Sequence, residues 1–254
     1  MDRQLILDGL RAAASAALFG IILLTFICIT YILPLPWSRF DTLFILALSA
    51  QVVLIIYKYE HAREALIIGV FHLLGTCMEL FKVSIGSWAY PVDGFFYIQN
   101  VPLFAGFMYA AVGSAIARGY RVYKVQLLNA PDSISLLLMS ACIYLNFFTH
   151  HFIYDVRYFI LAGIFYMCAQ TKVCMTIGYR RIEIHFLTIA TSLAALIWCA
   201  ENIATYAHVW RYPHQSVIWE PVHFEKITSW FLLMLVSFSL VTCMLYPTSQ
   251  RSKK

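Results

Sequence analysis

Two glutamates in this chain stand inside apolar segments, and each is followed at the same spacing by a Trp-x-Tyr-Pro sequence. The copies are Glu79 with Trp88, Tyr90 and Pro91, and Glu201 with Trp210, Tyr212 and Pro213. All four positions recur at a constant offset of 122 residues. Because the chain has only six Trp and eight Pro, the match predicts an internal duplication.

The chemistry open to these glutamates follows from the cost of burying a carboxylate. A buried Glu needs a cationic or donor partner, or else it stays protonated and can serve as a general acid. Steps of four, three and three place four polar residues on one helix face: His72, Thr76, Glu79 and Lys82. The predicted catalytic residues are therefore Glu79, Lys82 and His72, with Glu201 from the second copy. The alternative is a plain ion pair of Glu79 with Lys82 at a membrane interface.

Aromatic side chains in both copies are suited to line an apolar substrate. The predicted substrate-binding residues are Trp88, Tyr90, Asn202, Trp210 and Tyr212. Their ring faces attract positive charge. The alternative is an aromatic belt at the membrane interface, followed by a loop-forming proline.

A separate set of residues permits metal chemistry. His150, His151 and Asp155 lie in one connection, and three more histidines lie in another: His208, His214 and His223. Imidazole and carboxylate ligands suit zinc or iron, but the sequence lacks a His-x-x-x-His pair. We predict no cofactor and keep Asp155 as a catalytic candidate. A divalent metal at His150, His151 and Asp155 is the alternative.

Composition places these residues in a membrane protein. Hydrophobic residues make up 61% of the chain and charged residues 12%, with a mean hydropathy of +0.75, which leaves too little polar surface to cover the chain in water. Because backbone in hydrocarbon must satisfy its own hydrogen bonds, we predict an all-α polytopic bundle of about eight transmembrane helices. The apolar runs are 12–33, 41–57, 65–82, 102–117, 133–149, 156–174, 186–206 and 227–246.

The basic residues predict the orientation of the bundle. Thirteen of the 18 lie at the two ends of the chain and in the connections 58–64, 118–124 and 172–181. The positive-inside rule therefore places both termini in the cytoplasm. A basic inner rim accounts for the net charge of +5, so no nucleic-acid partner is predicted. Membrane lipids and a hydrophobic small molecule are the expected partners.

The duplication predicts the place of the site. The chain is treated as one membrane domain, 1–254, with repeats of about 1–125 and 126–254. An even number of helices in each half makes them parallel repeats, related by an axis along the membrane normal. Both Trp-x-Tyr-Pro copies then face outward, and the natural site lies between the repeats.

Several stretches resemble a known family. The segments 71–82, 86–91, 146–151 and 200–202 are similar to the YoaT-like family of uncharacterised bacterial integral membrane proteins. The resemblance covers nearly the whole chain, and it implies a multi-pass protein of the bacterial inner membrane.

A remoter resemblance concerns mechanism. An acidic residue, an aromatic segment and a Pro opening the next helix (Pro102 and Pro221) are similar to membrane lycopene cyclases and carotenoid hydratases. The cyclases carry paired acidic residues just after that proline, where this chain has Leu103 and Phe104. The resemblance implies acid–base chemistry without a cofactor on an isoprenoid or another lipid.

Together these observations favour a lipid- or isoprenoid-modifying enzyme that uses its carboxylates in an outward-facing site. The same carboxylates would also suit a proton-coupled transporter or permease. A metal-dependent membrane hydrolase is the third alternative.

Overall fold

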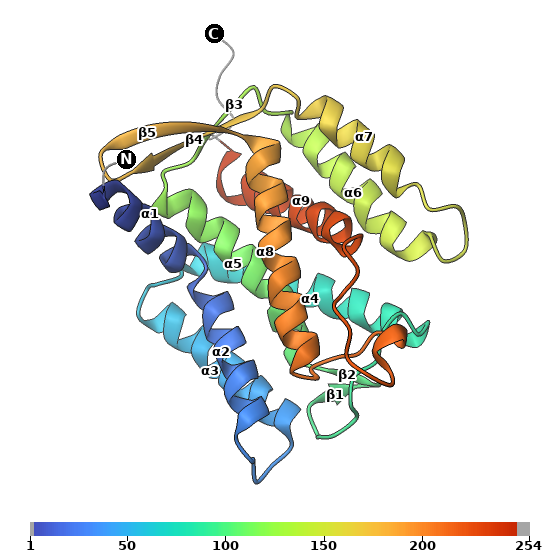
Figure 1. Ribbon diagram of the computed structural model, residues 1–254. Helices are drawn as coiled ribbons and strands as arrows, with labels where there is room; N and C mark the ends of the chain where they lie inside the picture. The colour runs from blue at the N-terminus through green and yellow to red at the C-terminus, as the bar shows by residue number, and fades with distance from the viewer. Residues whose placement is uncertain (1–2, 248–254) are drawn as a thin grey trace. The chain divides into compact units, whose positions relative to one another are not determined.

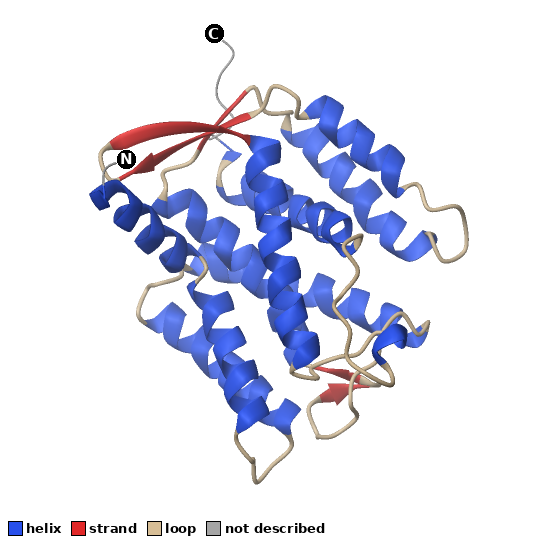
Figure 2. Cartoon of the chain, viewed as in Figure 1, coloured by secondary structure: helices blue, strands red, loops and turns tan. Residues whose placement is uncertain are grey.

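The computed structural model describes residues 3–247 of the chain, which form a mostly helical protein (Figures 1 and 2). The α-helices of this part are α1 (Arg3–Ala16), α2 (Leu18–Ile32), α3 (Arg39–Ile56), α4 (Ala62–Ser84), α5 (Phe104–Val122), α6 (Ser133–Thr149), α7 (Arg157–Met167), α8 (Phe186–Tyr206) and α9 (Lys226–Leu245). Each of the eight predicted apolar runs overlaps at least one helix. Two of them, α6 and α8, have the predicted bounds.

Fewer helices are long and apolar enough to span a membrane than the eight that the sequence predicted. Within residues 3–247, α3, α4, α8 and α9 are long and apolar enough to cross a membrane. The pair α1 and α2 would be a fifth span if its two helices are counted together. These apolar helices indicate a membrane protein.

Two predicted runs are wrong in detail. The run 12–33 is not one straight helix, because α1 and α2 meet at a bend of 70°. The run 156–174 is helical only to Met167, and its last residues enter strand β4 (Lys172–Ile177). β4 returns through Gly178, whose φ of 58° suits a tight hairpin turn, into β5 (Arg180–His185). The connection 172–181 is therefore part of a β-hairpin.

The chain divides into two compact units, and each draws on both halves of the sequence. Unit 1 contains residues 3–17, 115–196 and 227–247 of the described chain, and unit 2 contains 18–114 and 197–226. Both copies of the repeated sequence lie in unit 2.

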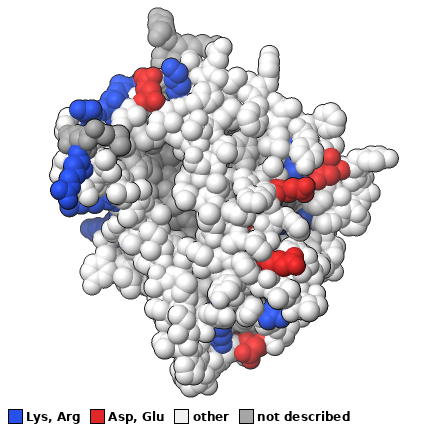
Figure 3. Space-filling view, in the orientation of Figure 1, with Lys and Arg blue, Asp and Glu red and all other residues white. Residues whose placement is uncertain are grey.

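Unit 1 combines helices with a small sheet. Strand β3 (Gln126–Leu128) pairs with β4, and β4 pairs with β5, all antiparallel. α1 lies against this sheet, since the Ile177 side chain comes within 3.7 Å of a Cβ built on Gly9. Basic side chains gather near α1 and the β4–β5 hairpin, whereas most of the visible face carries no charge (Figure 3).

Unit 2 is built around α2, α3, α4 and the first turns of α5. Its core includes Phe19, Leu43 and Phe104, each at most 3% exposed. A Cβ on Gly75 of α4 would lie 2.5 Å from the Tyr109 ring of α5, so glycine permits the close approach of these two helices.

The loops at one end of unit 2 are tied together by hydrogen bonds. They connect α2 to α3, α4 to α5 through strands β1 (Tyr97–Ile98) and β2 (Val101–Pro102), and α8 to α9. The Asp41 carboxylate accepts the N–H groups of Phe95 and Phe96, and the Arg39 guanidinium donates to the Ala207 carbonyl. The repeated sequences therefore lie in an ordered loop cluster.

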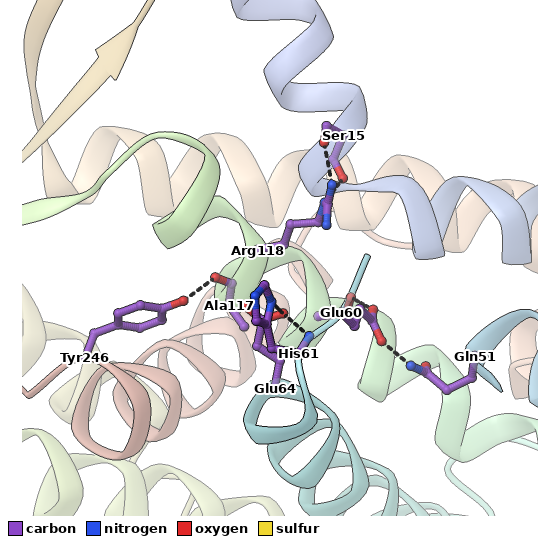
Figure 4. A network of polar contacts seen from close by, with 9 residues as sticks. Ser15, Gln51, Glu60, His61, Glu64, Ala117, Arg118 and Tyr246 are labelled. Carbon is purple, nitrogen blue, oxygen red and sulfur yellow. Dashed lines mark hydrogen bonds and ion pairs between the residues drawn. The ribbon is translucent and has the colours of Figure 1, made fainter. Parts of the chain in front are cut away.

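The α3–α4 connection carries a different polar network in unit 2 (Figure 4). The Gln51 amide and the Ser114 hydroxyl donate to the buried Glu60 carboxylate, and the His61 N–H donates to Glu64 over 2.9 Å. Figure 4 also shows contacts of unit 1, where Arg118 donates to the Ser15 carbonyl over 2.7 Å. These bonds satisfy polar groups in an otherwise apolar surrounding.

Candidate functional site

The two repeated sequences begin at helix ends of the same geometry. α4 ends at Ser84 and α8 at Tyr206, again 122 residues apart. Gly86 has a φ of 74° and His208 a φ of 55°, the left-handed conformation that closes many helices. The following N–H bonds back to the equivalent carbonyl in both copies, at 2.9 Å for Ser87 and 3.0 Å for Val209. The chain thus leaves α4 and α8 with the same backbone geometry.

Glu79 is buried and surrounded by hydrogen-bond donors. The residue as a whole is 3% exposed. Oε2 accepts from Trp88 Nε1 at 2.7 Å and from the Tyr90 hydroxyl at 2.8 Å. Oε1 accepts from the Tyr109 hydroxyl at 2.6 Å. Both oxygens are therefore held in place by side chains of the Trp-x-Tyr sequence and of α5.

Glu201 repeats the central contact of this arrangement. The residue is 4% exposed, and its Oε1 accepts from the Tyr212 hydroxyl at 2.5 Å. The sequence separation of this pair is 11 residues, as it is for Glu79 and Tyr90. The spacing noticed in the sequence therefore corresponds to a buried Glu–Tyr hydrogen bond in each copy.

The two copies meet at their central residues. Ala89 and Arg211, which occupy the x position of each Trp-x-Tyr, form an antiparallel bridge with N–H to O distances of 3.0 and 2.9 Å. Trp88 contacts Tyr212 with ring centroids 6.0 Å apart, and Tyr90 contacts Trp210 at 6.4 Å. Because equivalent residues pair with each other in opposite directions, the contact has a local two-fold relation.

Tyr90 and Tyr212 are constrained to act as donors. Both lie in loops outside the membrane-spanning helices. Burial, reinforced by the nearby glutamates, raises the pKa of each hydroxyl well above its ordinary value of 10.0. Each tyrosine therefore keeps its proton and offers it to a carboxylate.

A lysine completes the site. Lys226, the first residue of α9, lies in unit 2. Its Nζ is 4.5 Å from the centre of the Tyr212 ring and 5.0 Å from that of Trp88. The site thus combines two buried carboxylates with a cation held against two ring faces.

Asn202 positions the second copy. Its amide donates to the Trp198 carbonyl at 2.8 Å, and its Oδ1 accepts from the Val222 N–H at 2.9 Å. Asn202 therefore fixes the α8–α9 loop to α8 and uses its polar atoms within the protein. This is a positioning role, and the predicted contact of Asn202 with a substrate stays a prediction.

His72 and Lys82 lie in unit 2 with the glutamates. Lys82 is 4% exposed, one helical turn beyond Glu79. The His72 ring contacts Phe107 at 4.6 Å, and its buried Nδ1 has no hydrogen-bond partner among residues 3–247. Both remain predicted participants in the chemistry.

Asp155 belongs to unit 1 and serves local structure there. It accepts a 3.1 Å hydrogen bond from Asn146, and its other oxygen lies 3.1 Å from the Arg157 guanidinium. His150 bonds the Asn146 carbonyl at 2.7 Å. In the described part of the chain, no group of three or more His, Cys, Asp or Glu side chains is arranged to hold a metal.

Two site residues escaped prediction. Tyr109 lies 30 residues from Glu79 and outside the repeated sequence, so no spacing pointed to it. Lys226 stands next to other polar residues in the sequence, and its place over two rings depends on the tertiary structure. The sequence feature that could have pointed to Tyr109 is Gly75, the glycine opposite its ring.

Comparisons with known proteins address the family and the fold. A solved structure titled as a cross-linked MvINS R77C trimer has a similar fold, with a TM-score of 0.52 at 13% identity over 77% of this chain and 98% of that one. The uncharacterised protein YoaT of Bacillus subtilis (strain 168) is 38% identical over 240 residues, which are 94% of this chain and 90% of YoaT. Residues 4–238 match a family described as proteins of unknown function, DUF817. The chain therefore belongs to the DUF817 family, which confirms the expected YoaT-like relationship.

Proposed function

We propose that the protein is an integral membrane enzyme that uses Glu79 and Glu201 for acid–base chemistry on a lipid or isoprenoid substrate. The observation that carries this proposal is the same buried Glu–Tyr hydrogen bond in both copies. Proton transfer needs a carboxylate held at a fixed place and shielded from bulk water. The resemblance of the sequence pattern to lycopene cyclases favours the isoprenoid class.

The hydrogen bonds suggest different roles for the two glutamates. Three donors hold Glu79 as an acceptor, so it is suited to stabilise positive charge on the substrate. Glu201 is the proposed proton-transfer group, with Tyr212 as the side chain that orients it. Lys82 and His72 supply further polar groups of the same unit. The aromatic residues Trp88, Tyr90, Trp210 and Tyr212 would contact the apolar part of the substrate.

A proton-coupled transporter is the second candidate. Glu79 and Glu201 lie in α4 and α8, which are both long and apolar enough to cross a membrane. Ionisable groups within such helices are typical of proton pathways. A metal-dependent hydrolase has no comparable support in the described residues, because His150, His151 and Asp155 do not form a ligand set.

The proposed setting is the bacterial inner membrane, with both termini in the cytoplasm and the loop cluster of unit 2 outside. Eight crossings in two parallel repeats would agree with the uneven distribution of basic residues. The helix least suited to cross the membrane is α7, because its 11 residues rise only about 16 Å. It would need a thinned bilayer to cross.

Replacing Glu201 separates the two candidate functions. Glu201→Gln keeps the shape and removes the ionisable group. If Glu201 is a general acid, turnover should fall by about 10²–10⁴-fold while substrate binding persists. If Glu201 couples protons, the variant should lose gradient-driven accumulation but keep exchange.

Comparative lipidomics of a deletion strain supplies the candidate substrates for this assay. Glu225→Gln, in an exposed residue of the α8–α9 loop, is the matched control and should restore the lipid profile like the natural chain. A lipid profile unaffected by deletion, together with accumulation of a polar solute, would exclude the enzyme and support the transporter.

A further inference from the structure

Trp88 and Tyr212 form two walls around a positive charge. Their rings meet edge to face at 78°, with centroids 6.0 Å apart. The Lys226 ammonium lies over both rings, at 5.0 Å from the centre of Trp88 and 4.5 Å from that of Tyr212. Two aromatic faces around one cation are the arrangement by which proteins recognise methylated ammonium groups.

Each wall is anchored by a buried glutamate of a different copy. Trp88 Nε1 donates to Glu79 at 2.7 Å, and the Tyr212 hydroxyl donates to Glu201 at 2.5 Å. These bonds hold the rings with their faces toward the cation. The cage is therefore preorganised for positive charge.

We propose that this aromatic cage binds the quaternary ammonium head group of the substrate, and that Lys226 occupies the cage until this group displaces it. The inference rests on the proposed function, because it assigns a head group to the substrate of the same site. The ammonium group could belong to a membrane lipid or to a free solute of the choline type.

Hydration favours this exchange. A lysine ammonium is compact and strongly hydrated in water. A quaternary ammonium has no N–H to donate, so it loses little by leaving water for two ring faces. Lys226 and Trp88 are both partly exposed, and the flexible stem of lysine allows the displaced ammonium to move aside.

Titration of the purified full chain with choline tests the cage directly. The chain is placed in nanodiscs of phosphatidylglycerol, and calorimetry compares choline with its uncharged analogue 3,3-dimethyl-1-butanol. Choline should bind and the neutral analogue should not. Lys226→Met should bind choline about tenfold more tightly, because the internal cation no longer competes. Lys226→Arg, which keeps a cation at the cage, should bind no more tightly than the natural chain.

Loss of one wall gives the converse result. Trp88→Leu should weaken choline binding about tenfold or more in the natural chain and in the Lys226→Met background. Thermal unfolding of every variant monitors folding. If Lys226→Met does not fold, the choline comparison between the natural chain and Trp88→Leu decides the question.

Three results would overturn the proposal: equal binding of choline and the neutral analogue, unchanged affinity in Lys226→Met, or loss of choline binding in that variant. The last would show that Lys226 itself contacts an anionic part of the ligand. Adding phosphatidylcholine to the nanodiscs distinguishes the sources, since a lipid head group would compete with choline. Failure here with a lipid profile that still depends on Glu201 would leave the proposed enzyme standing without this head group.

Discussion

At the scale of single residues, His208 of the loop cluster lies where a positive charge is unfavourable. It has a left-handed backbone conformation just beyond the end of α8. Its ring lies 5.8 Å from that of Tyr31. Burial, with the positive charges of Arg211 and Arg39, lowers the pKa of the imidazole below its ordinary value of 6.5. The folded protein therefore favours neutral His208.

This shift predicts a pH dependence of stability. As the pH falls below about 6.5, His208 of the unfolded chain takes up a proton before His208 of the folded chain does. The free energy of unfolding should be highest above that pH and should decline toward lower pH. Thermal unfolding between about pH 7.5 and 5.5 measures the decline, and His208→Gln should reduce its slope. Equal slopes in both proteins would contradict the prediction.

At the scale of elements, two helices approach closely where glycine allows it. Gly75 of α4 faces the Tyr109 ring of α5, and the hydroxyl of that tyrosine donates to Glu79. The packing of the helices and the position of the carboxylate thus depend on the same residue. The repeated helix ends at Ser84 and Tyr206 then set the course of both loops.

Gly75→Ala should disturb this contact. The added Cβ would lie 2.5 Å from the Tyr109 ring, and overpacking of this kind costs about 1–3 kcal/mol of unfolding free energy. Gly69→Ala is the matched control in the same helix, because nothing lies within 4 Å of its Cβ. That variant should be neutral or more stable, since Ala is the better helix former. Denaturant titration in detergent compares the two variants. Equal stability would show that α5 moves away from the added methyl group without cost.

At the scale of the whole molecule, the direction of the helices decides which solution the loop cluster faces. Val217 is 97% exposed in the α8–α9 loop, and Tyr57 is 80% exposed at the far end of α3. Tyr154, in the α6–α7 loop of unit 1, is 94% exposed. The three positions report on the proposed topology.

Single cysteines at these positions test the topology with an impermeant thiol reagent in intact cells. The background should lack the natural cysteines, because Cys77, Cys142 and Cys199 are exposed. We expect Val217→Cys and Tyr154→Cys to react directly, and Tyr57→Cys to react only after permeabilisation. Labelling of Tyr57→Cys alone would reverse the orientation. Labelling of Val217→Cys without Tyr154→Cys would exclude the crossing by α6 and α7 that eight spans require.

Local patterns determined much of the protein. Long apolar runs in a membrane satisfy their backbone polar groups as helices, so each predicted run overlaps at least one helix. The repeated spacing from glutamate to tyrosine also has a local cause, because equal helix ends and equal turns carry the chain over an equal distance. The β4–β5 hairpin was missed because the start of β4 lies in the apolar run 156–174, and the sheet depends on the pairing of β4 with β5 and with β3.

Tertiary structure alone decided which partners meet. The sequence predicted that Glu79 finds a cationic or donor partner or stays protonated, and the folded chain places the donors of Trp88, Tyr90 and Tyr109 around it. Asp155 belongs to unit 1, whereas both glutamates belong to unit 2. Helical periodicity reports which residues share a face, but it carries no information about which loop or helix lies opposite. The bridge between Ala89 and Arg211 and the place of Lys226 over two rings depend on such long-range contacts.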